Sequence, residues 1–224
     1  MSRARILGGI RATLDAATDT TLRRRGVTQR LAQPPTHLRP RRAMHAGAEC
    51  VAQFKEFQRT LGVDVVDVAT DAEIPAAVAE YLAALGLPLR LRRGNDPHLA
   101  ALAWGSVASL GIDTGAADDG DAVGLSRAIA GVAETGTLVL ASGSGSPVTL
   151  GLLPDMHIVV LRANAIVASY EEACERVLDA NAGAMPRTLN LVTGASRTGD
   201  IGGKIVMGAH GPRRLAVVLV AGDV

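Results

Sequence analysis

Short apolar segments of strand length alternate with amphipathic segments of helical period along most of this chain. Residues 48–61 and 170–180 carry apolar side chains every three or four positions, which predicts two helices with one buried face each. The predicted strands cover residues 63–68, 87–90, 137–141, 157–161, 166–168, 189–192 and the apolar stretch that ends at Val220. This alternation predicts an α/β fold with a mostly parallel sheet that helices cover on both faces.

The segments outside this alternation predict an N-terminal arm and a loop. Apolar spacing over residues 2–25 predicts a helix that ends at Gly26, and the prolines within residues 27–47 predict an extended connector. Residues 111–120 are rich in Gly, Asp and Ala and predict a surface loop. We therefore divide the chain into a basic helix with a proline-rich arm, residues 1–47, and a single α/β domain, residues 48–224.

Charge is distributed unevenly along the chain. Residues 1–42 hold ten arginines and two aspartates, a net charge of +8, and because the whole chain carries +1 the remaining residues carry −7. This polarity predicts that the arm lies against its own body or a neighbouring subunit, and binding of a partner protein or a polyanion is the alternative. Aromatic residues make up only 2% of the chain, which argues against nucleic-acid binding by base stacking.

Cysteine content and hydropathy restrict the cofactors and the location. Cys50 and Cys174 are the only cysteines, so the chain lacks the four thiolates of an iron–sulfur cluster or a zinc ribbon. No apolar run approaches eighteen residues, and the first residues lack the apolar core of a secretory signal. We expect a cytoplasmic protein with no membrane insertion, no cofactor of its own and the capacity to form a homo-oligomer.

A polar, glycine-rich stretch between two apolar segments, residues 187–220, is the first candidate site. We predict that it folds as strand, polar turn, short helix, glycine-rich loop and strand. Side-chain oxygens of Ser196, Thr198 and Asp200 stand where the helix would start, and Arg197 lies between them. Hydroxyls, guanidinium and free helix amides together would bind a small anion, while simple capping of the helix is the alternative.

A second candidate is the carboxylate of Glu134, followed by Thr135, Gly136 and Thr137. It stands between apolar residues and a Thr-Gly-Thr turn, so we expect a partly desolvated group suited to act as a base or nucleophile. The alternative is that Glu134 only bonds the adjacent backbone. The loop at residues 142–147, rich in Gly and Ser, either approaches a ligand closely or is simply flexible.

Two histidines could meet these groups. His157 begins an apolar strand and His210 lies in a Gly-Ala-His-Gly-Pro loop before another. As a pair with Glu134 or Asp200 they could hold a metal or transfer a proton, but structural histidines are the default, and we predict no metal site. The hypothesis for the site is that residues 193–200 and His210 face Glu134 across one rim of the sheet.

Four ordered motifs in the second half of the chain resemble the LUD domain family of lactate utilization proteins. They are Ala-Glu-Thr-Gly-Thr-Leu-Val-Leu at residues 133–140, Leu-Leu-Pro at 152–154 with His157, Gly-Ala-Ser-Arg-Thr-Gly-Asp-Ile at 194–201 and Gly-Ala-His-Gly-Pro at 208–212. The resemblance implies a fold similar to the group that contains sugar isomerases, CoA-transferases and formyltetrahydrofolate cyclo-ligase. From the two candidate stretches we expect ligand contacts at Thr135, Gly136, Thr137, Gly194, Ser196, Arg197, Thr198, Asp200, His210 and Gly211.

The functions that the resemblance implies fall into different classes. The first is an accessory or ligand-binding subunit of a cytoplasmic system that oxidises L-lactate to pyruvate, with iron–sulfur clusters only in partner proteins. The alternative is a stand-alone enzyme of the CoA-transferase or cyclo-ligase kind, because Glu134-Thr-Gly136 faintly resembles the catalytic Glu-Asn-Gly of class I CoA-transferases. A purely structural scaffold is a third interpretation.

Overall fold

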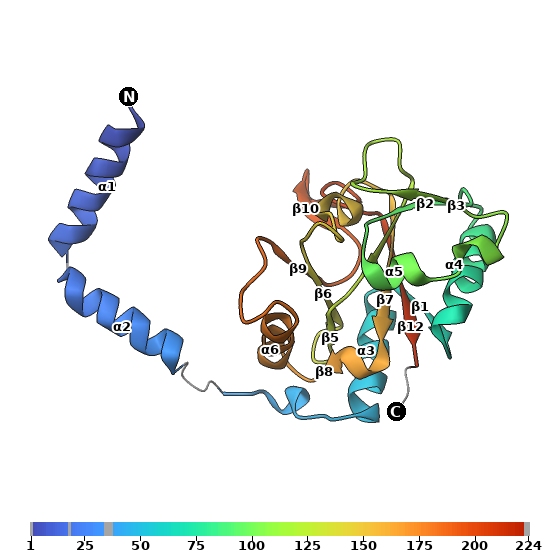
Figure 1. Cartoon of the computed structure of the whole chain (residues 1–224), viewed down its shortest axis with the longest axis horizontal. Coiled ribbons are helices and arrows are strands. Elements are labelled where there is room, and N and C mark those ends of the chain that lie inside the picture. Colours follow the sequence, from blue (N-terminus) through green and yellow to red (C-terminus); the bar gives the residue numbers. More distant parts are fainter. Residues whose placement is uncertain (1, 18, 34–37, 222–224) are drawn as a thin grey trace. The chain divides into compact units, whose positions relative to one another are not determined.

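The computed structural model describes residues 2–17, 19–33 and 38–221 of the 224-residue chain, and within these the side chains of Ala17, Asp200 and Ile201 lie outside the description. Contacts divide the chain into two compact units, Met1–Arg39 and Pro40–Val224. Figure 1 shows the helices of the first unit and the packed sheets and helices of the second.

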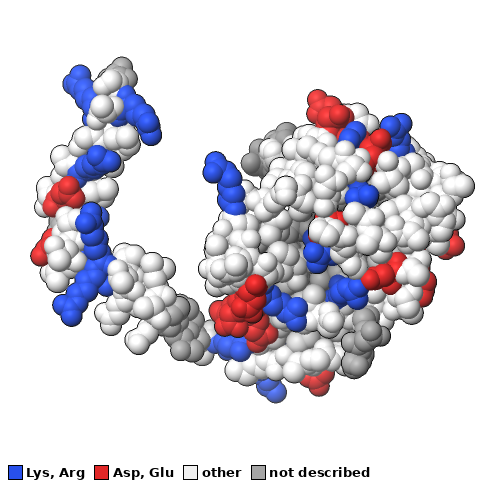
Figure 2. Space-filling model, viewed as in Figure 1, with Lys and Arg blue, Asp and Glu red and all other residues white. Residues whose placement is uncertain are grey.

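The first unit consists of two helices, α1 (Arg3–Ala17) and α2 (Thr20–Ala32). The prediction of one helix that ends at Gly26 is wrong. Helix α1 ends at Ala17, and α2 begins at Thr20 and continues through Gly26. The Asp19 carboxylate accepts hydrogen bonds from the amides of Thr21 and Leu22 and so caps a new helix. A single glycine in an exposed helix costs only about 1 kcal/mol, which its neighbours offset. Figure 2 shows basic side chains distributed along both helices.

Within residues 38–221, six strands form a parallel sheet in the order β1-β12-β7-β4-β2-β3. Their bounds are β1 Asp64–Val68, β2 Arg90–Arg93, β3 Gly111–Thr114, β4 Val123–Arg127, β7 Met156–Arg162 and β12 Arg214–Val220. Two inner strands, β7 and β12, are buried along nearly their whole length. This main sheet confirms the predicted α/β class, and the near-continuous apolar sequence of these inner strands is typical of parallel sheets covered on both faces.

A second, mostly antiparallel sheet covers part of one face of the main sheet. It has the order β8-β5-β6-β9 within the described part of the chain, with only the β5–β8 pair parallel. Its strands are β5 Ala130–Val132, β6 Thr137–Ala141, β8 Ile166–Val167 and β9 Leu189–Val192. This small sheet was not predicted as a separate layer, because its strands have the same local pattern as those of the main sheet.

Helices complete the layers on both sides (Figure 1). On one face of the main sheet, α4 (Ile74–Ala84) and α5 (Pro97–Ala101) pack through one apolar cluster. On the other face, α3 (Ala48–Thr60) packs with the small sheet through a second cluster. Helix α6 (Tyr170–Ala180) covers the far side of the small sheet. The predicted helices at residues 48–61 and 170–180 are confirmed by α3 and α6.

Two strands at one edge of the main sheet differ from the sequence prediction. Strand β2 begins at Arg90, where the predicted strand ended, and β3 occupies the start of the predicted surface loop. Both strands carry charged residues that pair with each other, as in the contact of 2.6 Å between Arg90 Nε and Asp113 Oδ2. A polar edge strand lacks the apolar pattern on which the prediction relied.

The largest local error concerns the stretch after β9. A hairpin of β10 (Arg197–Ile201) and β11 (Lys204–Met207) stands where a short helix was predicted. Gly202 and Gly203, with φ of 61° and 72°, form its two-residue turn. Such turns require left-handed backbone at both positions, which glycine adopts without strain. The helix start that would have offered free amides to an anion is therefore absent from the described backbone of residues 193–207.

Substitution of Gly124 would test how closely η4 packs against the main sheet. A Cβ at this position of β4 would lie 2.2 Å from the carbonyl oxygen of Leu150, which belongs to the turn η4 (Val148–Gly151). We expect Gly124→Ala to lower the free energy of unfolding by about 1–3 kcal/mol, because backbone must move to relieve the clash. Chemical denaturation measures the change. The control Gly105→Ala meets no atom within 4 Å and should change stability by less than about 0.5 kcal/mol; equal effects would contradict the prediction.

Candidate functional site

The turn between β5 and β6 holds Glu134 in a buried position. Its side chain is 8% exposed, and Oε2 lies 3.5 Å from Nε of Arg42, whose own side chain is largely exposed. The amide of Glu134 donates to the carbonyl of Ala168 at 3.3 Å. The carboxylate is thus largely buried, and its partner is a cation from the segment predicted to form the arm.

The Thr-Gly-Thr turn after Glu134 is held by bonds within the fold. Thr137 is fully buried, and its Oγ1 lies 2.8 Å from Oγ1 of Thr135, 2.7 Å from the Tyr170 hydroxyl and 2.7 Å from Oγ1 of Thr193. These four residues come from β6, its preceding turn, α6 and the end of β9. Their hydroxyls satisfy one another, so the cluster joins the small sheet to α6.

Gly136 allows the same turn to approach α3. Its φ is +67°, and a Cβ would lie 2.7 Å from Cβ of Phe57. Its carbonyl accepts a hydrogen bond of 3.0 Å from Nε2 of the buried Gln58. Only a residue without a side chain fits this left-handed, close-packed position.

The other predicted ligand residues lie near the amino end of the main sheet. Ser196 Oγ accepts a bond of 3.3 Å from the amide of His210, and a Cβ at Gly211 would lie 3.5 Å from Cβ of Ser196. Arg197 donates from Nη2 to the carbonyl of Leu61 at 2.9 Å, at the C-terminal end of α3. A cation there satisfies an end carbonyl and complements the helix dipole.

Three further positions complete the predicted set. Gly194 packs against Leu61 with a φ of +84°, and Thr198 is half-buried on β10. The side chain of Asp200 lies outside the described residues. Among the described side chains, Thr193 reaches the Glu134 turn through Thr137, whereas no hydrogen bond or ion pair joins Glu134 to Arg197 or His210. Thr193 thus links the start of the polar turn to the Glu134 turn, next to the pairing of β6 with β9.

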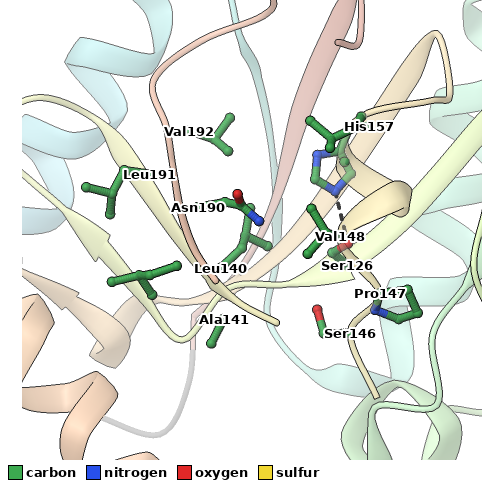
Figure 3. A pocket seen from close by; sticks show the side chains of 13 residues that line it. Ser126, Leu140, Ala141, Ser146, Pro147, Val148, His157, Asn190, Leu191 and Val192 are labelled. Atoms are coloured by element: carbon green, nitrogen blue, oxygen red, sulfur yellow. Dashed lines mark hydrogen bonds between the residues drawn. The ribbon is translucent and has the colours of Figure 1, made fainter. Parts of the chain in front are cut away.

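A cavity of about 270 Å³ lies between the small sheet and the main sheet. Figure 3 shows β6 and β9 on one side of it and β4, β7 and η4 on the other. The lining residues are Ser126, Leu140, Ala141, Ser146, Pro147, Val148, Gly151, Leu152, His157, Leu189, Asn190, Leu191 and Val192. Of the residues that the sequence analysis considered, His157 lines it, as do Ser146 and Pro147 of the loop at residues 142–147.

His157 and Ser126 form a buried polar pair on the cavity side of the main sheet. Side chains alternate along β7, so Met156 and Ile158 join the α4 cluster while His157 points to the opposite face. Its Nε2 lies 3.0 Å from Oγ of Ser126, and the two residues are 1% and 5% exposed. Burial lowers the pKa of His157 to about 4, so the imidazole is neutral at pH 7.

The remaining ring nitrogen of His157 has no partner among the described residues. Nδ1 is buried and makes no hydrogen bond, although buried polar groups in proteins almost always have one. Gly151 lies against the ring, since a Cβ there would be 3.0 Å from Cε1. The cavity can therefore hold a small molecule against an unused hydrogen-bonding atom.

Sequence reasoning missed Ser126 and Asn190. Each is a single polar residue inside an apolar strand, Val-Gly-Leu-Ser and Leu-Asn-Leu-Val respectively. That interruption was the available signal, because a polar side chain on a buried strand face requires a partner.

Neither a metal centre nor a membrane span is found in the described part of the chain. No group of three or more His, Cys, Asp or Glu side chains there is arranged to hold a metal ion. Among the same residues, no helix combines the length and the apolar character needed to cross a membrane.

Comparison with known proteins identifies relatives over most of the second unit. Residues 51–220 match the LUD domain family. The chain is 35% identical over 184 residues to lactate utilization protein C of Deinococcus radiodurans, covering 77% of this chain and 80% of that protein. A crystal structure of a DUF162 family protein from Deinococcus radiodurans has a TM-score of 0.61 and 27% identity, over 79% of this chain and 99% of that chain.

Other relatives match over a shorter span. An uncharacterized protein of Neisseria meningitidis serogroup B is 36% identical over 100 residues, which cover 45% of this chain. Lactate utilization protein C of Bacillus subtilis is 33% identical over 101 residues, or 44% of this chain. In both cases the matched part of the chain spans only 42% of the relative's length.

The hydroxyl cluster predicts a stability effect. Thr137→Val keeps the shape of the fully buried side chain but takes one bond from each of its partners, the half-buried Thr135 and Tyr170 and the exposed Thr193. We therefore expect a loss of about 1–3 kcal/mol in the free energy of unfolding. Denaturant titration measures it. Thr188→Val, at an exposed position without a side-chain hydrogen bond among the described residues, is the matched control; a loss no larger than the control's would argue against the cluster.

Burial of His157 predicts a pH effect. Its folded pKa of about 4 lies below the ordinary 6.5, so the unfolded chain binds the additional proton first as pH falls. Above pH 6.5 the neutral ring makes its whole contribution to the free energy of unfolding. Between pH 7 and pH 5 this free energy falls by about 2 kcal/mol. We expect unfolding titrations of His157→Gln to lack this part of the decrease.

The control for that titration is His210→Gln, which removes an exposed histidine and should keep the wild-type profile. Parallel pH profiles for wild type and His157→Gln would show that the ring is solvated in the folded chain.

Proposed function

The chain belongs to the LUD domain family, and we propose that it is a component of a cytoplasmic system that oxidises L-lactate to pyruvate. In that system it acts as an accessory or ligand-binding subunit beside iron–sulfur partner proteins. The observation that carries this proposal is the similarity to lactate utilization protein C of Deinococcus radiodurans, which extends over most of both chains.

The chemistry of lactate oxidation supports an accessory role. Conversion of the hydroxyl carbon to a ketone releases two electrons and two protons, which an electron acceptor must take up. The chain has two cysteines, fewer than the four thiolates of a typical cluster. Burial, with the nearby carboxylates of Glu172 and Glu49, raises the pKa of Cys50 and opposes the thiolate form that binds metals. Clusters in partner proteins would accept the electrons.

The alternative is a stand-alone enzyme of the CoA-transferase or cyclo-ligase kind that uses Glu134. Its carboxylate is engaged by Arg42 and does not line the cavity beside His157, which favours the accessory role. Incubation of the purified chain with acyl-CoA donors separates the two functions. A trapped glutamyl thioester at Glu134 that is absent from Glu134→Gln would support the enzyme, and an accessory subunit forms none.

Deletion of the gene in its source organism tests the proposal. We expect the strain to lose growth on L-lactate and to keep normal growth on pyruvate, because only the oxidation step is removed. A plasmid copy should restore growth. A deletion strain that grows equally well on both carbon sources would overturn the proposal.

Affinity purification of the tagged chain from lactate-grown cells tests the subunit role separately. Iron–sulfur proteins should co-purify with it and should be absent when an unrelated cytoplasmic protein carries the same tag. If the deletion strain fails to grow on L-lactate but no iron–sulfur protein co-purifies, the role in lactate oxidation would stand and the role as an accessory subunit would be rejected.

A further inference from the structure

We propose that the cavity between β6, β9 and the main sheet binds a small uncharged molecule whose polar end carries both a hydrogen-bond donor and an acceptor, as a carboxamide does, between His157 and Asn190. The inference concerns the ligand class of this cavity and does not depend on a role in lactate oxidation.

The unused nitrogen of His157 points to a ligand. The ring is 1% exposed and its Nδ1 has no partner among the described residues. Leaving such a group without a bond costs about 1–3 kcal/mol. The partner Ser126 is a hydroxyl, which can either donate to Nε2 or accept from it. In the first case Nδ1 carries a proton to donate, and in the second Nδ1 is an acceptor, so the pair adapts to either kind of ligand atom.

Asn190 offers the complementary groups from the opposite wall. Its amide carries one acceptor and two donors, and its side chain makes no hydrogen bond to another described residue. Figure 3 shows this side chain projecting from β9 on the side of the cavity that faces His157, Ser126 and Val148. A molecule between these walls would meet donors and acceptors on both sides.

The lining selects against an ionised ligand. No Asp, Glu, Lys or Arg is among the thirteen residues that line the cavity. The single titratable group, His157, is held neutral by burial, with its pKa lowered to about 4. A carboxylate placed here would lose its hydration without gaining a cation, which costs far more than transfer of an uncharged amide. The cavity thus disfavours lactate and other carboxylates as ligands.

Size and access limit the ligand further. The volume of about 270 Å³ suits a small molecule. Leu140, Val148 and Val192 supply apolar wall around the polar groups. Leu152 and Leu191 also line the cavity and are 48% and 52% exposed, so it reaches the surface beside them. A small amide with an apolar body matches this combination.

Matched pairs of probes test the ligand class. Lactamide and L-lactate, and benzamide and benzoate, differ chiefly in whether the end group is an amide or a carboxylate. We would titrate each into the ¹⁵N-labelled full chain at pH 7 and follow the Asn190 side-chain amide and the His157 ring nitrogens by NMR. At least one amide should bind saturably and at least about tenfold more tightly than its acid, equivalent to about 1.4 kcal/mol.

Variants locate the binding. Asn190→Ala and Ser126→Ala should each weaken the amide by about fivefold or more, because each removes a hydrogen-bonding group of the site. Asn164→Ala, an exposed asparagine that does not line the cavity, is the matched control and should bind like wild type. The ring nitrogen signals of His157 should report a change at Nδ1 only when an amide is bound.

Three outcomes would overturn the proposal. Acids that bind as tightly as their amides would show that the cavity accepts charge. Amide binding that Asn190→Ala and Ser126→Ala leave unchanged would place the ligand elsewhere. Absence of any shift at Asn190 and His157 with all four probes would show that the cavity is not a site for small polar molecules.

Discussion

Burial of the main sheet on both faces is the constraint on which the rest of the structure depends. Along β7, Met156, Ile158 and Val160 pack toward α4, while Val159 and Leu161 pack toward α3 and the small sheet. Each buried aliphatic side chain of this kind stabilises the fold by about 1.5–3 kcal/mol. Because neither face is available to water, a polar residue on these strands must find a partner inside the protein.

His157 shows the consequence of that constraint. Its place on β7 directs the ring toward the small sheet, where Ser126 of the neighbouring strand β4 satisfies one nitrogen. Close packing of η4 on Gly124 and of Gly151 on the ring keeps the pair in position. The small sheet does not close completely over this corner, and the remaining space is the cavity. The same burial that makes the imidazole neutral also determines which molecules the cavity can accept.

The two polar regions of the molecule differ in what they leave unsatisfied. The Thr-Gly-Thr turn, with Tyr170 and Thr193, uses its hydroxyls internally, and Glu134 has Arg42 beside it. Arg197 is likewise engaged by the end of α3. The cavity, in contrast, retains unused hydrogen-bonding atoms. Room for a small molecule beside unused polar atoms is therefore found at the cavity, whereas the polar groups of the Thr-Gly-Thr turn and Arg197 hold sheets and helices together.

The sequence by itself determined the α/β class, the helices at residues 48–61 and 170–180, most central strands and the family resemblance, because periodicity and ordered motifs are local properties. The sequence prediction was wrong where the spacing of apolar residues gives no clear period. A Gly-Gly hairpin replaces a predicted helix, and a charged edge strand lies where a loop was predicted. Only the tertiary structure decided which strands form the small sheet and which polar groups meet. Ser126 with His157, Thr137 with Thr193 and Arg197 with Leu61 are contacts between residues 31, 56 and 136 positions apart. Such pairs arise from the packing of layers, which no local pattern encodes.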